Sequence, residues 1–481
     1  MKEWRDIVQK NALKSASTYY LIGTLFNKGF AFLTVPIFTR ILSTADYGVV
    51  TTYDSWIGIS SVVIGFAIYM GIRSSFVDYP EKVDDFLSVC VTFTLMCGII
   101  LIFAVGVVLI LFQSRINYTL VFLCLLQGLA TAIVQDYSTY LMMRLDYKFR
   151  TMLMVVPNLL SSVIAVVAIL FILKTKLYMG KIVPMALVNI GMASLLLVLT
   201  YRKSKMLFNK KYLNYALKIS APLVLHGIAL NILSQSDRTM ITVLGDASQT
   251  GIYSLIYNFG MIAVVITTAL EGIWVPWFYN KLKENAATEI NCIAKDYVHL
   301  MTYLLIGVIA IGPEIVKFLA SNQYWEGIKI IPPIVLSNFM IFVYTLYVNI
   351  EHYHGKTVFI TLNTFVAAGS NLILNYFFIP KFGYVAAAYT TLLSYSIAFA
   401  FHARYAKRLE PELFPIQMFI ASFLQLAVTV ITFYFFRDVW YVRFVAVLLF
   451  ELCMLRKERD RIAFYVPSIK ENGRIRFCSK N

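Results

Sequence analysis

The chain has 481 residues, of which 59% are hydrophobic and 14% are charged, and its mean hydropathy is +0.72. A water-soluble domain has about 25% charged residues, so the composition excludes a soluble enzyme or a soluble binding module. Apolar runs of about 20 residues, long enough to cross a bilayer as helices, recur along the whole chain. The sequence therefore predicts an all-α polytopic membrane protein.

Fourteen spans are expected in chain order. They cover residues 15–41, 48–70, 87–112, 118–141, 151–173, 182–201, 218–245, 250–279, 294–319, 328–350, 357–379, 384–403, 414–436 and 439–455.

The net charge of +16 is distributed unevenly between the predicted loops. When residues at the span ends are counted with the adjoining loop, one side of the membrane holds 30 Lys and Arg and the other side holds 10. Loops rich in Lys and Arg stay in the cytoplasm, so both termini are predicted to be cytoplasmic. The basic charge then faces anionic lipids and does not indicate a nucleic-acid partner.

Two basic residues lie deep inside predicted spans. Arg238 follows Asp237 in the apolar stretch Lys218–Gly245, and Lys28 lies in the middle of the first span. Charged groups in a span are costly and normally face a bundle interior or an aqueous cavity. The alternatives are local neutralisation, of Arg238 by Asp237 and of Lys28 by Asp54, and for Arg238 anchoring at the membrane interface.

Other polar residues recur at helical spacing on several spans and are candidates for the lining of a cavity. Hydrogen bonding between helices explains them nearly as well. They are Thr24 and Asn27 in the first span, Gln127, Thr131 and Gln135 in the fourth, Asn231 and Gln235 in the seventh, Asn338 and Asn349 in the tenth, and Thr361 and Asn371 in the eleventh.

Four carboxylates are candidates for coupling transport to H⁺ or Na⁺, because burial and neighbouring charges change how a carboxylate binds protons and cations. These are Asp54, Asp136, Asp237 and Glu271. The alternative for each is a structural ion pair or a place at the membrane boundary. The six cysteines lack the spacing of a metal site or a disulfide framework, so no metal and no other cofactor are expected.

A short internal echo predicts two similar halves. LKSA at Leu13–Ala16 returns as LKISA at Leu217–Ala221, and ILSTADYG at Ile41–Gly48 returns within VLGDASQTGIY at Val243–Tyr253. Six spans separate the equivalent helices, so the halves share one orientation and are related by a pseudo-twofold axis along the membrane normal. The predicted parts are a cytoplasmic N-terminal segment 1–14, a six-helix N-lobe 15–201, a basic linker 202–217, a six-helix C-lobe 218–403, two accessory spans 404–455 and a basic cytoplasmic tail 456–481.

The opening NKGFAFLTVPIFTRILSTADYG resembles the first-helix signature of bacterial polysaccharide-biosynthesis flippases. That signature has P-x-x-T/S-R-x-L, a polar turn and an aromatic residue followed by glycine. The matching residues here are Pro36, Thr39, Arg40, Leu42, Tyr47 and Gly48. SQSDRTMITVLG followed by TGIYSL resembles the seventh helix and following turn of the same family. The resemblance implies a two-lobe, fourteen-helix transporter of the O-antigen type in the multidrug/oligosaccharidyl-lipid/polysaccharide exporter superfamily.

Such transporters move undecaprenyl-diphosphate-linked oligosaccharide across the bacterial inner membrane, so the resemblance implies this function by alternating access. Arg offers phosphate a planar fork and Lys a point charge, so Lys28 and Arg238 are the expected diphosphate ligands. The implied substrate is an O-antigen, capsule or exopolysaccharide repeat unit, and the implied partners are membrane lipids, a polysaccharide polymerase and a chain-length regulator. Having only two deep basic residues argues against a lipid II flippase.

Three other functions remain as alternatives. A cation-coupled multidrug antiporter of the same superfamily would favour acidic residues in its cavity. A membrane polysaccharide polymerase or glycosyltransferase would carry large extracytoplasmic loops, whereas the outer loops expected here are short. A membrane scaffold is the third. The sequence also lacks a GxxxxGK[ST] phosphate loop, so the chain is predicted not to be an enzyme.

Overall fold

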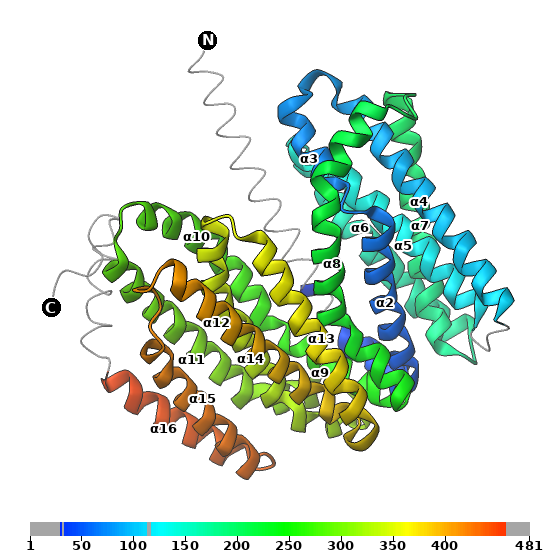
Figure 1. Ribbon diagram of the computed structural model, residues 1–481. Helices are drawn as coiled ribbons and strands as arrows, with labels where there is room; N and C mark the ends of the chain where they lie inside the picture. The colour runs from blue at the N-terminus through cyan, green and yellow to red at the C-terminus, as the bar shows by residue number, and fades with distance from the viewer. Residues whose placement is uncertain (1–28, 31–32, 113–116, 458–481) are drawn as a thin grey trace. The chain divides into compact units, whose positions relative to one another are not determined.

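The computed structural model describes residues 29–30, 33–112 and 117–457, and among these residues every regular element is a helix. The described chain divides after Gly251 into two compact units (Figure 1). This division does not coincide with the predicted linker at residues 202–217. The two predicted lobes and the linker between them therefore stay a prediction.

From Thr44 onward the first unit contains seven α-helices and two short helical segments, residues 33–41 before them are also helical, and α9 (Ala247–Gly260) spans the division. The elements are α2 (Thr44–Gly65), α3 (Tyr69–Asp78), η1 (Pro80–Lys82), α4 (Val83–Leu111), α5 (Tyr118–Met143), α6 (Tyr147–Val167), η2 (Ala168–Ile172), α7 (Leu177–Lys203) and α8 (Lys210–Leu244). In the second unit they are α10 (Ile262–Lys283), α11 (Ala287–Leu319), η3 (Asn322–Ile330), α12 (Ile331–Tyr353), α13 (Thr357–Phe382), α14 (Tyr384–Leu409), α15 (Gln417–Phe435) and α16 (Trp440–Lys457).

The helices agree with the predicted spans from 48–70 onward, since each of those spans falls on a helix or a consecutive helix pair. Within the described residues, nine helices are long and apolar enough to cross a bilayer, and eleven spans result if each of two bent pairs counts as one. The bends measure 41° between α2 and α3 and 44° within α8, at residues 221–223. Most of the first predicted span lies outside the described residues.

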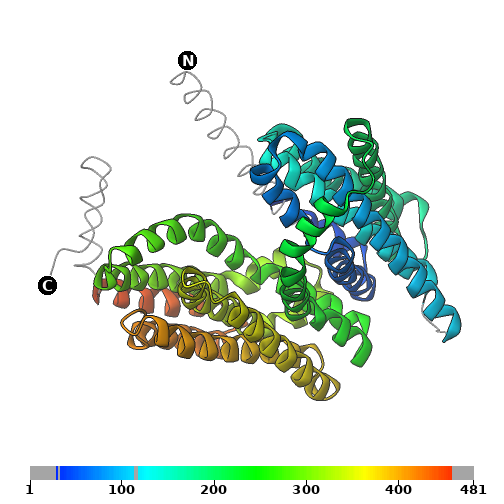
Figure 2. The same ribbon diagram turned by 45° about the horizontal axis from the view of Figure 1, so that its top comes forward.

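The first unit packs α2 and α5 together at its centre. The two helices approach closely because Gly128 of α5 has no side chain. A Cβ at this position would overlap the Ser60 hydroxyl of α2. An apolar core that includes Phe86, Tyr137 and Leu196 lies between α4, α5 and α7. The helix α4 runs at the edge of the unit (Figures 1 and 2), and only 17% of its most apolar window is buried.

The second unit is built around α12. The most apolar window of the span 322–353 is 78% buried, the highest share of any described span. The helices α10, α11 and α14 pack against α12, and α15 and α16 pack along α11 (Figure 1). The guanidinium of Arg443 on α16 is fully buried and binds Glu314 and the Ala310 carbonyl of α11 (2.9 Å), which attaches this last helix to the unit.

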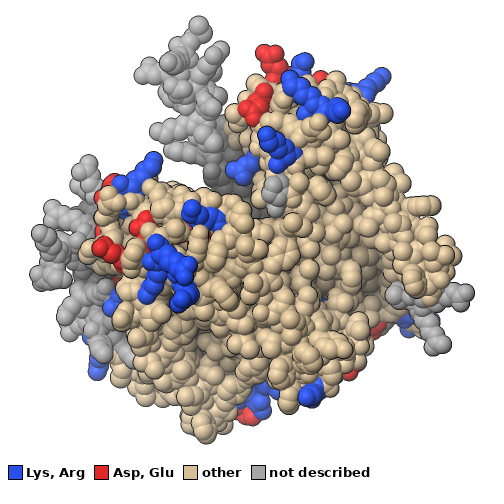
Figure 3. All heavy atoms as spheres, in the orientation of Figure 1, with Lys and Arg blue, Asp and Glu red and all other residues tan. Residues whose placement is uncertain are grey.

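The surface of the described residues has the distribution expected of a protein in a membrane. Large apolar side chains such as Phe103, Ile110 and Phe171 are exposed on it. On the face in Figure 3, most Lys and Arg side chains gather toward helix ends, and a broad surface between them carries few charged groups. The chain is therefore a multi-pass membrane protein.

The two echoed segments begin helices in the same way. The Ser43 hydroxyl accepts the Asp46 N–H at 3.0 Å before α2. The Asp246 carboxylate accepts the Gln249 N–H at 2.8 Å before α9. These side chains satisfy amide groups that the first turn of a helix leaves free. The helices start 203 residues apart, close to the offset of the sequence echo.

Candidate functional site

Arg238 is buried in α8 with 6% of its side chain exposed. It lies six residues before the helix end at Leu244, which is about 9 Å along the axis at the rise of an α-helix. Its Nη1 donates to Gln235 Oε1 at 2.7 Å and to the Ser234 carbonyl at 3.3 Å. Gln235 Oε1 also accepts from the Ser55 hydroxyl of α2 at 3.2 Å. These bonds fix the guanidinium beside the contact of α8 with α2.

The structure adds a second basic group and an acid to this site. Asp54 of α2 interacts electrostatically with Lys181 of α7 and with Arg238. The Lys181 Nζ lies 4.2 Å from the Phe38 ring centroid and 5.3 Å from that of Tyr47. The candidate site therefore brings the cations Arg238 and Lys181 within electrostatic range of Asp54, and the buried Asp237 is the neighbour of Arg238 in the sequence.

Lys181 was not predicted as a site residue because it falls in a short predicted loop, between the spans 151–173 and 182–201. It lies near the start of α7 and packs against Phe38 and Tyr47, within electrostatic range of Asp54. The predicted Asp237 is 1% exposed on α8. Three predicted residues, Thr24, Asn27 and Lys28, lie outside the described residues.

The contact between α2 and α8 includes two further predicted residues. Asn231 donates from Nδ2 to the Gly227 carbonyl at 3.0 Å, and its Oδ1 would lie 3.2 Å from a Cβ built on Gly58. The hydroxyls of Thr52 and Thr242 lie 2.8 Å apart. Polar side chains thus line most of this helix pair, and Asn231 and Gln235 belong to the same contact as Arg238.

The predicted residues of the fourth span take part mainly in packing. Gln127 is buried and accepts from the Tyr53 hydroxyl at 2.9 Å, while the Thr131 hydroxyl donates to the Gln127 carbonyl at 2.8 Å. Asp136 is 1% exposed and accepts from the Thr94 hydroxyl at 2.8 Å. Gln135 is exposed on α5. Hydrogen bonding between helices therefore accounts for Gln127 and Asp136.

Asn338 of the tenth span has a structural position. Its Nδ2 donates to the Gly260 carbonyl at 3.2 Å and to the Ile334 carbonyl at 3.0 Å. Gly260 is the last residue of α9, where the chain leaves that helix and enters α10. Because a helix end leaves carbonyl groups without intrahelical partners, Asn338 stabilises the break between the two helices.

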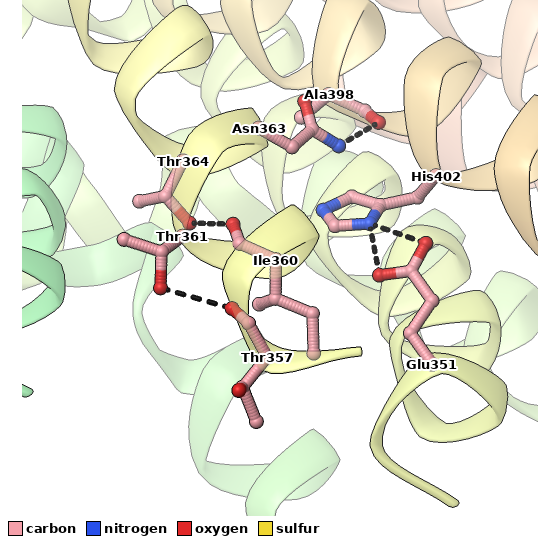
Figure 4. Close-up of polar contacts among 8 residues, drawn as sticks. All are labelled: Glu351, Thr357, Ile360, Thr361, Asn363, Thr364, Ala398 and His402. Carbon is pink, nitrogen blue, oxygen red and sulfur yellow. Dashed lines mark hydrogen bonds and ion pairs between the residues drawn. The ribbon is translucent and has the colours of Figure 1, made fainter. Parts of the chain in front are cut away.

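Asn371 and Thr361 of the eleventh span lie in different surroundings. Asn371 is buried, donates to Thr391 Oγ1 at 3.2 Å and accepts from Asn375 Nδ2 at 3.1 Å. Asn375 in turn accepts from Thr390 at 2.5 Å, so an amide and hydroxyl network joins α13 to α14. Thr361 is half-buried, and its hydroxyl donates to the carbonyl of Thr357 at 3.0 Å (Figure 4).

Glu271 lines a small hollow in the second unit, which is too narrow for a water molecule as the side chains stand. Asn349, Trp274, Tyr297 and three further residues complete its wall. The Trp274 Nε1, the Tyr297 hydroxyl and the Asn349 Nδ2 are buried and make no hydrogen bond within the described chain. One carboxylate and three hydrogen-bonding groups thus line the same hollow. Among the described residues, no group of three or more His, Cys, Asp or Glu is arranged to hold a metal.

A buried ionisable pair in the second unit was not predicted from the sequence. His402 Nδ1 of α14 lies 2.8 Å and 3.0 Å from the carboxylate oxygens of Glu351 on α12 (Figure 4). The side chains are 3% and 0% exposed, and the Tyr344 ring stacks on the imidazole. The pair joins α12 to α14. The sequence gives no signal for it because 51 residues separate the partners.

Comparison with solved structures identifies the fold. The chain is similar to the structure described as lipid II flippase MurJ in an inward closed conformation, with a TM-score of 0.66, 17% identity and coverage of 92% of this chain and 99% of that one. It is also similar to an inward-facing multidrug resistance MATE family transporter of the MOP superfamily, with a TM-score of 0.58, 11% identity and coverage of 82% and 99%. The chain has the multi-helix fold of these transporters.

Comparison of sequences gives the family. The chain is 22% identical over 392 residues to Lsg locus putative protein 1 of Haemophilus influenzae, an alignment that covers 75% of this chain and 90% of that protein. Residues 13–280, more than half of the chain, match the family model described as polysaccharide biosynthesis protein. The family resemblance noted in the sequence is thereby confirmed. The chain belongs to the polysaccharide biosynthesis protein family.

Proposed function

We propose that the chain is a flippase for polyprenyl-diphosphate-linked oligosaccharide, working by alternating access in the bacterial inner membrane with both termini in the cytoplasm. The buried Arg238, held by Gln235 in an apolar helix, is the observation that carries the proposal. Membership in the polysaccharide biosynthesis family and the fold shared with a lipid flippase support it. The proposed activity moves the substrate across the membrane without making or breaking a covalent bond in it.

A diphosphate is the anion that suits this site. A guanidinium in a membrane interior is costly unless an anion neutralises it, and Arg binds phosphate through two parallel hydrogen bonds. Lys181 is a second cation within electrostatic range of Asp54, as Arg238 is. The proposal is that a diphosphate binds Arg238 in competition with the carboxylates Asp54 and Asp237. Lys28 is proposed as a further ligand.

The remainder of the substrate needs partners for its hydroxyl groups and a route for its lipid tail. Asn231 lies on α8 one helical turn before Gln235 and is proposed to contact sugar hydroxyls. The polyprenyl chain is proposed to stay in the bilayer throughout transport. A polymerase and a chain-length regulator are proposed as the next proteins to act on the transferred repeat unit.

Coupling to an ion is proposed at Glu271. Asp136 already accepts a hydrogen bond from Thr94 inside the first unit, whereas Glu271 lines a hollow together with hydrogen-bonding groups. A carboxylate in such a position binds a proton or Na⁺ and releases it when its surroundings change. Asp54 and Asp237 are the other candidates, close to the proposed anion site.

A cation-coupled multidrug antiporter is the second candidate function. One observation favours it: Glu271 shares its hollow with Trp274 and Tyr297, whose rings stack with centroids 5.2 Å apart. A carboxylate beside aromatic rings suits an organic cation. Growth in the presence of cationic drugs distinguishes the two functions, because an antiporter raises drug resistance and an oligosaccharide flippase does not.

The proposal is tested in a strain that lacks the gene and therefore lacks surface polysaccharide. Wild-type protein is expected to restore the polymer, whereas Arg238→Ala and Lys28→Ala are expected to leave it absent and lipid-linked repeat units accumulated. Immunoblotting of membranes checks that each variant is present. Arg73→Ala is the matched control, because Arg73 is exposed on α3. Normal polymer in both site variants would contradict the diphosphate role.

A further inference from the structure

The starts of α2 and α9 cross at two glycines. A methyl group on Gly48 would overlap the Ala247 carbonyl oxygen, and one on Gly251 would overlap the Thr44 carbonyl oxygen. Each glycine is the fifth residue of its helix, and each carbonyl belongs to the first residue of the other helix. The contact is therefore reciprocal, as at a local twofold axis. We call residues 44–48 and 247–251 the glycine crossing.

Hydroxyl groups complete the glycine crossing. Thr44 Oγ1 and Ser248 Oγ lie 2.6 Å apart and share a hydrogen bond. Glycine allows two backbones to approach closely because it has no side chain. No bulky side chain from either glycine position interlocks with the opposite helix, so the helices can separate here without unthreading side chains.

Hydrogen bonds link the glycine crossing to the Arg238 site. The Thr242 hydroxyl lies 2.7 Å from that of Thr250, which belongs to the crossing, and 2.8 Å from that of Thr52. The Thr242 hydroxyl donates its one hydrogen to the Arg238 carbonyl at 2.9 Å, so in the bond between the two threonines the Thr250 hydroxyl is the donor. This chain of bonds joins the main chain of α8 at Arg238 to the start of α9.

We propose that the glycine crossing is the extracytoplasmic gate of the transport path, closed in this structure, and that the Thr242 and Thr250 hydroxyls hold the start of α9 against α8 in the closed state. The inference rests on the proposed function and on the predicted orientation, which places the starts of α2 and α9 at the outer surface. In this proposal, the contact between the starts of α2 and α9 must break before the substrate leaves on the outer side.

Reversible cross-linking tests the gate. Thr44→Cys and Ser248→Cys are combined in a variant whose six native cysteines are replaced by serine, and a disulfide is formed in cells with copper phenanthroline. Synthesis of new surface polysaccharide is measured before oxidation, after oxidation and after reduction. The expected result is loss of new polymer on oxidation and recovery on reduction. Each single-cysteine variant should be unaffected by both treatments.

The outcomes separate this inference from the proposed function. If the reduced double-cysteine protein restores polymer and the cross-linked protein is equally active, the crossing stays closed throughout transport and the gate is refuted. If wild-type protein fails to restore polymer at all, the proposed function fails first. Labelling of free thiols measures the cross-linked fraction. Activity that comes from protein without the cross-link is then not mistaken for transport by cross-linked protein.

Glycine variants give a second test that does not depend on a disulfide. Gly48→Ala and Gly251→Ala place a methyl group against a carbonyl and should prevent closure. A cysteine at position 52 should then react faster with a membrane-impermeant thiol reagent applied from outside. Gly191→Ala is the matched control, because a Cβ at Gly191 has nothing within 4 Å. Unchanged labelling in both crossing variants, with protein present at normal levels, would overturn the gate.

Discussion

Replacing Gln235 with Glu tests the role of Arg238 without removing it. Gln235 Oε1 lies 2.7 Å from Arg238 Nη1 and 3.2 Å from Ser55 Oγ. Glutamate has nearly the same shape, so the variant keeps both hydrogen bonds and replaces a neutral acceptor with a carboxylate. The guanidinium then gains a carboxylate at the position of Gln235, and the substrate diphosphate must compete with it.

The expected cost follows from the strength of the new contact. A charge-assisted hydrogen bond is roughly twice as strong as a neutral one, and a net neutral bond contributes about 1 kcal/mol. The diphosphate must therefore displace a partner that is stronger by about 1–2 kcal/mol. This difference corresponds to roughly 5–30-fold weaker substrate binding, while the folded protein keeps its stability because no buried group loses a partner.

Binding of a short-chain polyprenyl diphosphate to purified protein measures this change, and thermal unfolding in detergent checks that the fold is intact. Gln417→Glu is the control, since it makes the same substitution at an exposed position at the start of α15. Equal affinity of Gln235→Glu, Gln417→Glu and wild-type protein would refute the reasoning. Arg238 would then hold α8 and α2 together without binding the diphosphate.

Three other expectations concern the second unit. Arg443→Ala leaves Glu314 and a buried carbonyl without their partner and should lower the free energy of unfolding, measured in detergent, by about 3–5 kcal/mol. Arg437→Ala is the control and should cost little, because the Arg437 side chain is 41% exposed. Equal losses in the two variants would contradict this account. His402→Ala should destabilise by a similar amount because it leaves Glu351 buried alone, and adding Glu351→Gln should restore part of the loss. Glu271→Gln should abolish the dependence of transport in proteoliposomes on an imposed H⁺ or Na⁺ gradient, and an unchanged dependence would exclude Glu271 as the coupling residue.

Hydropathy and charge were sufficient to predict the helices but not their interruptions. The span 48–70 is bent between α2 and α3, where Phe66 and Ala67 both have φ of 50°. Residues other than glycine rarely adopt this left-handed conformation, and neither residue type predicts a break. The separation of α9 from α10 at Met261 follows Gly260, as the bend after α2 follows Gly65, but a single glycine within an apolar run does not by itself predict a break. Tertiary packing, such as the bonds from Asn338 to the end of α9, decides where these helices stop.

The candidate site was predictable where charged residues interrupt an apolar run. Arg238 was predicted on this ground, together with its neighbour Asp237, and the structure places Arg238 in the buried contact of α8 with α2. Its neighbour Lys181 could not be found in this way, because its packing against Phe38 and Tyr47 depends on residues more than 130 positions away. The Glu351–His402 pair was missed for the same reason, since a single sequence shows no contact between distant positions.

The echoed segments explain how a repeated structure acquires a specialised site. The starts of α2 and α9 keep the same capped turn and the same glycine at equivalent places, because both are needed for the reciprocal crossing. The helices that precede them need not match, and α8 carries the buried Arg238 near its end. Hydroxyls at Thr242 and Thr250 connect that arginine's backbone to the crossing. The two echoed segments are therefore alike where the starts of α2 and α9 meet. They differ one to two helical turns before the end of α8, where Arg238 is proposed to bind an anion.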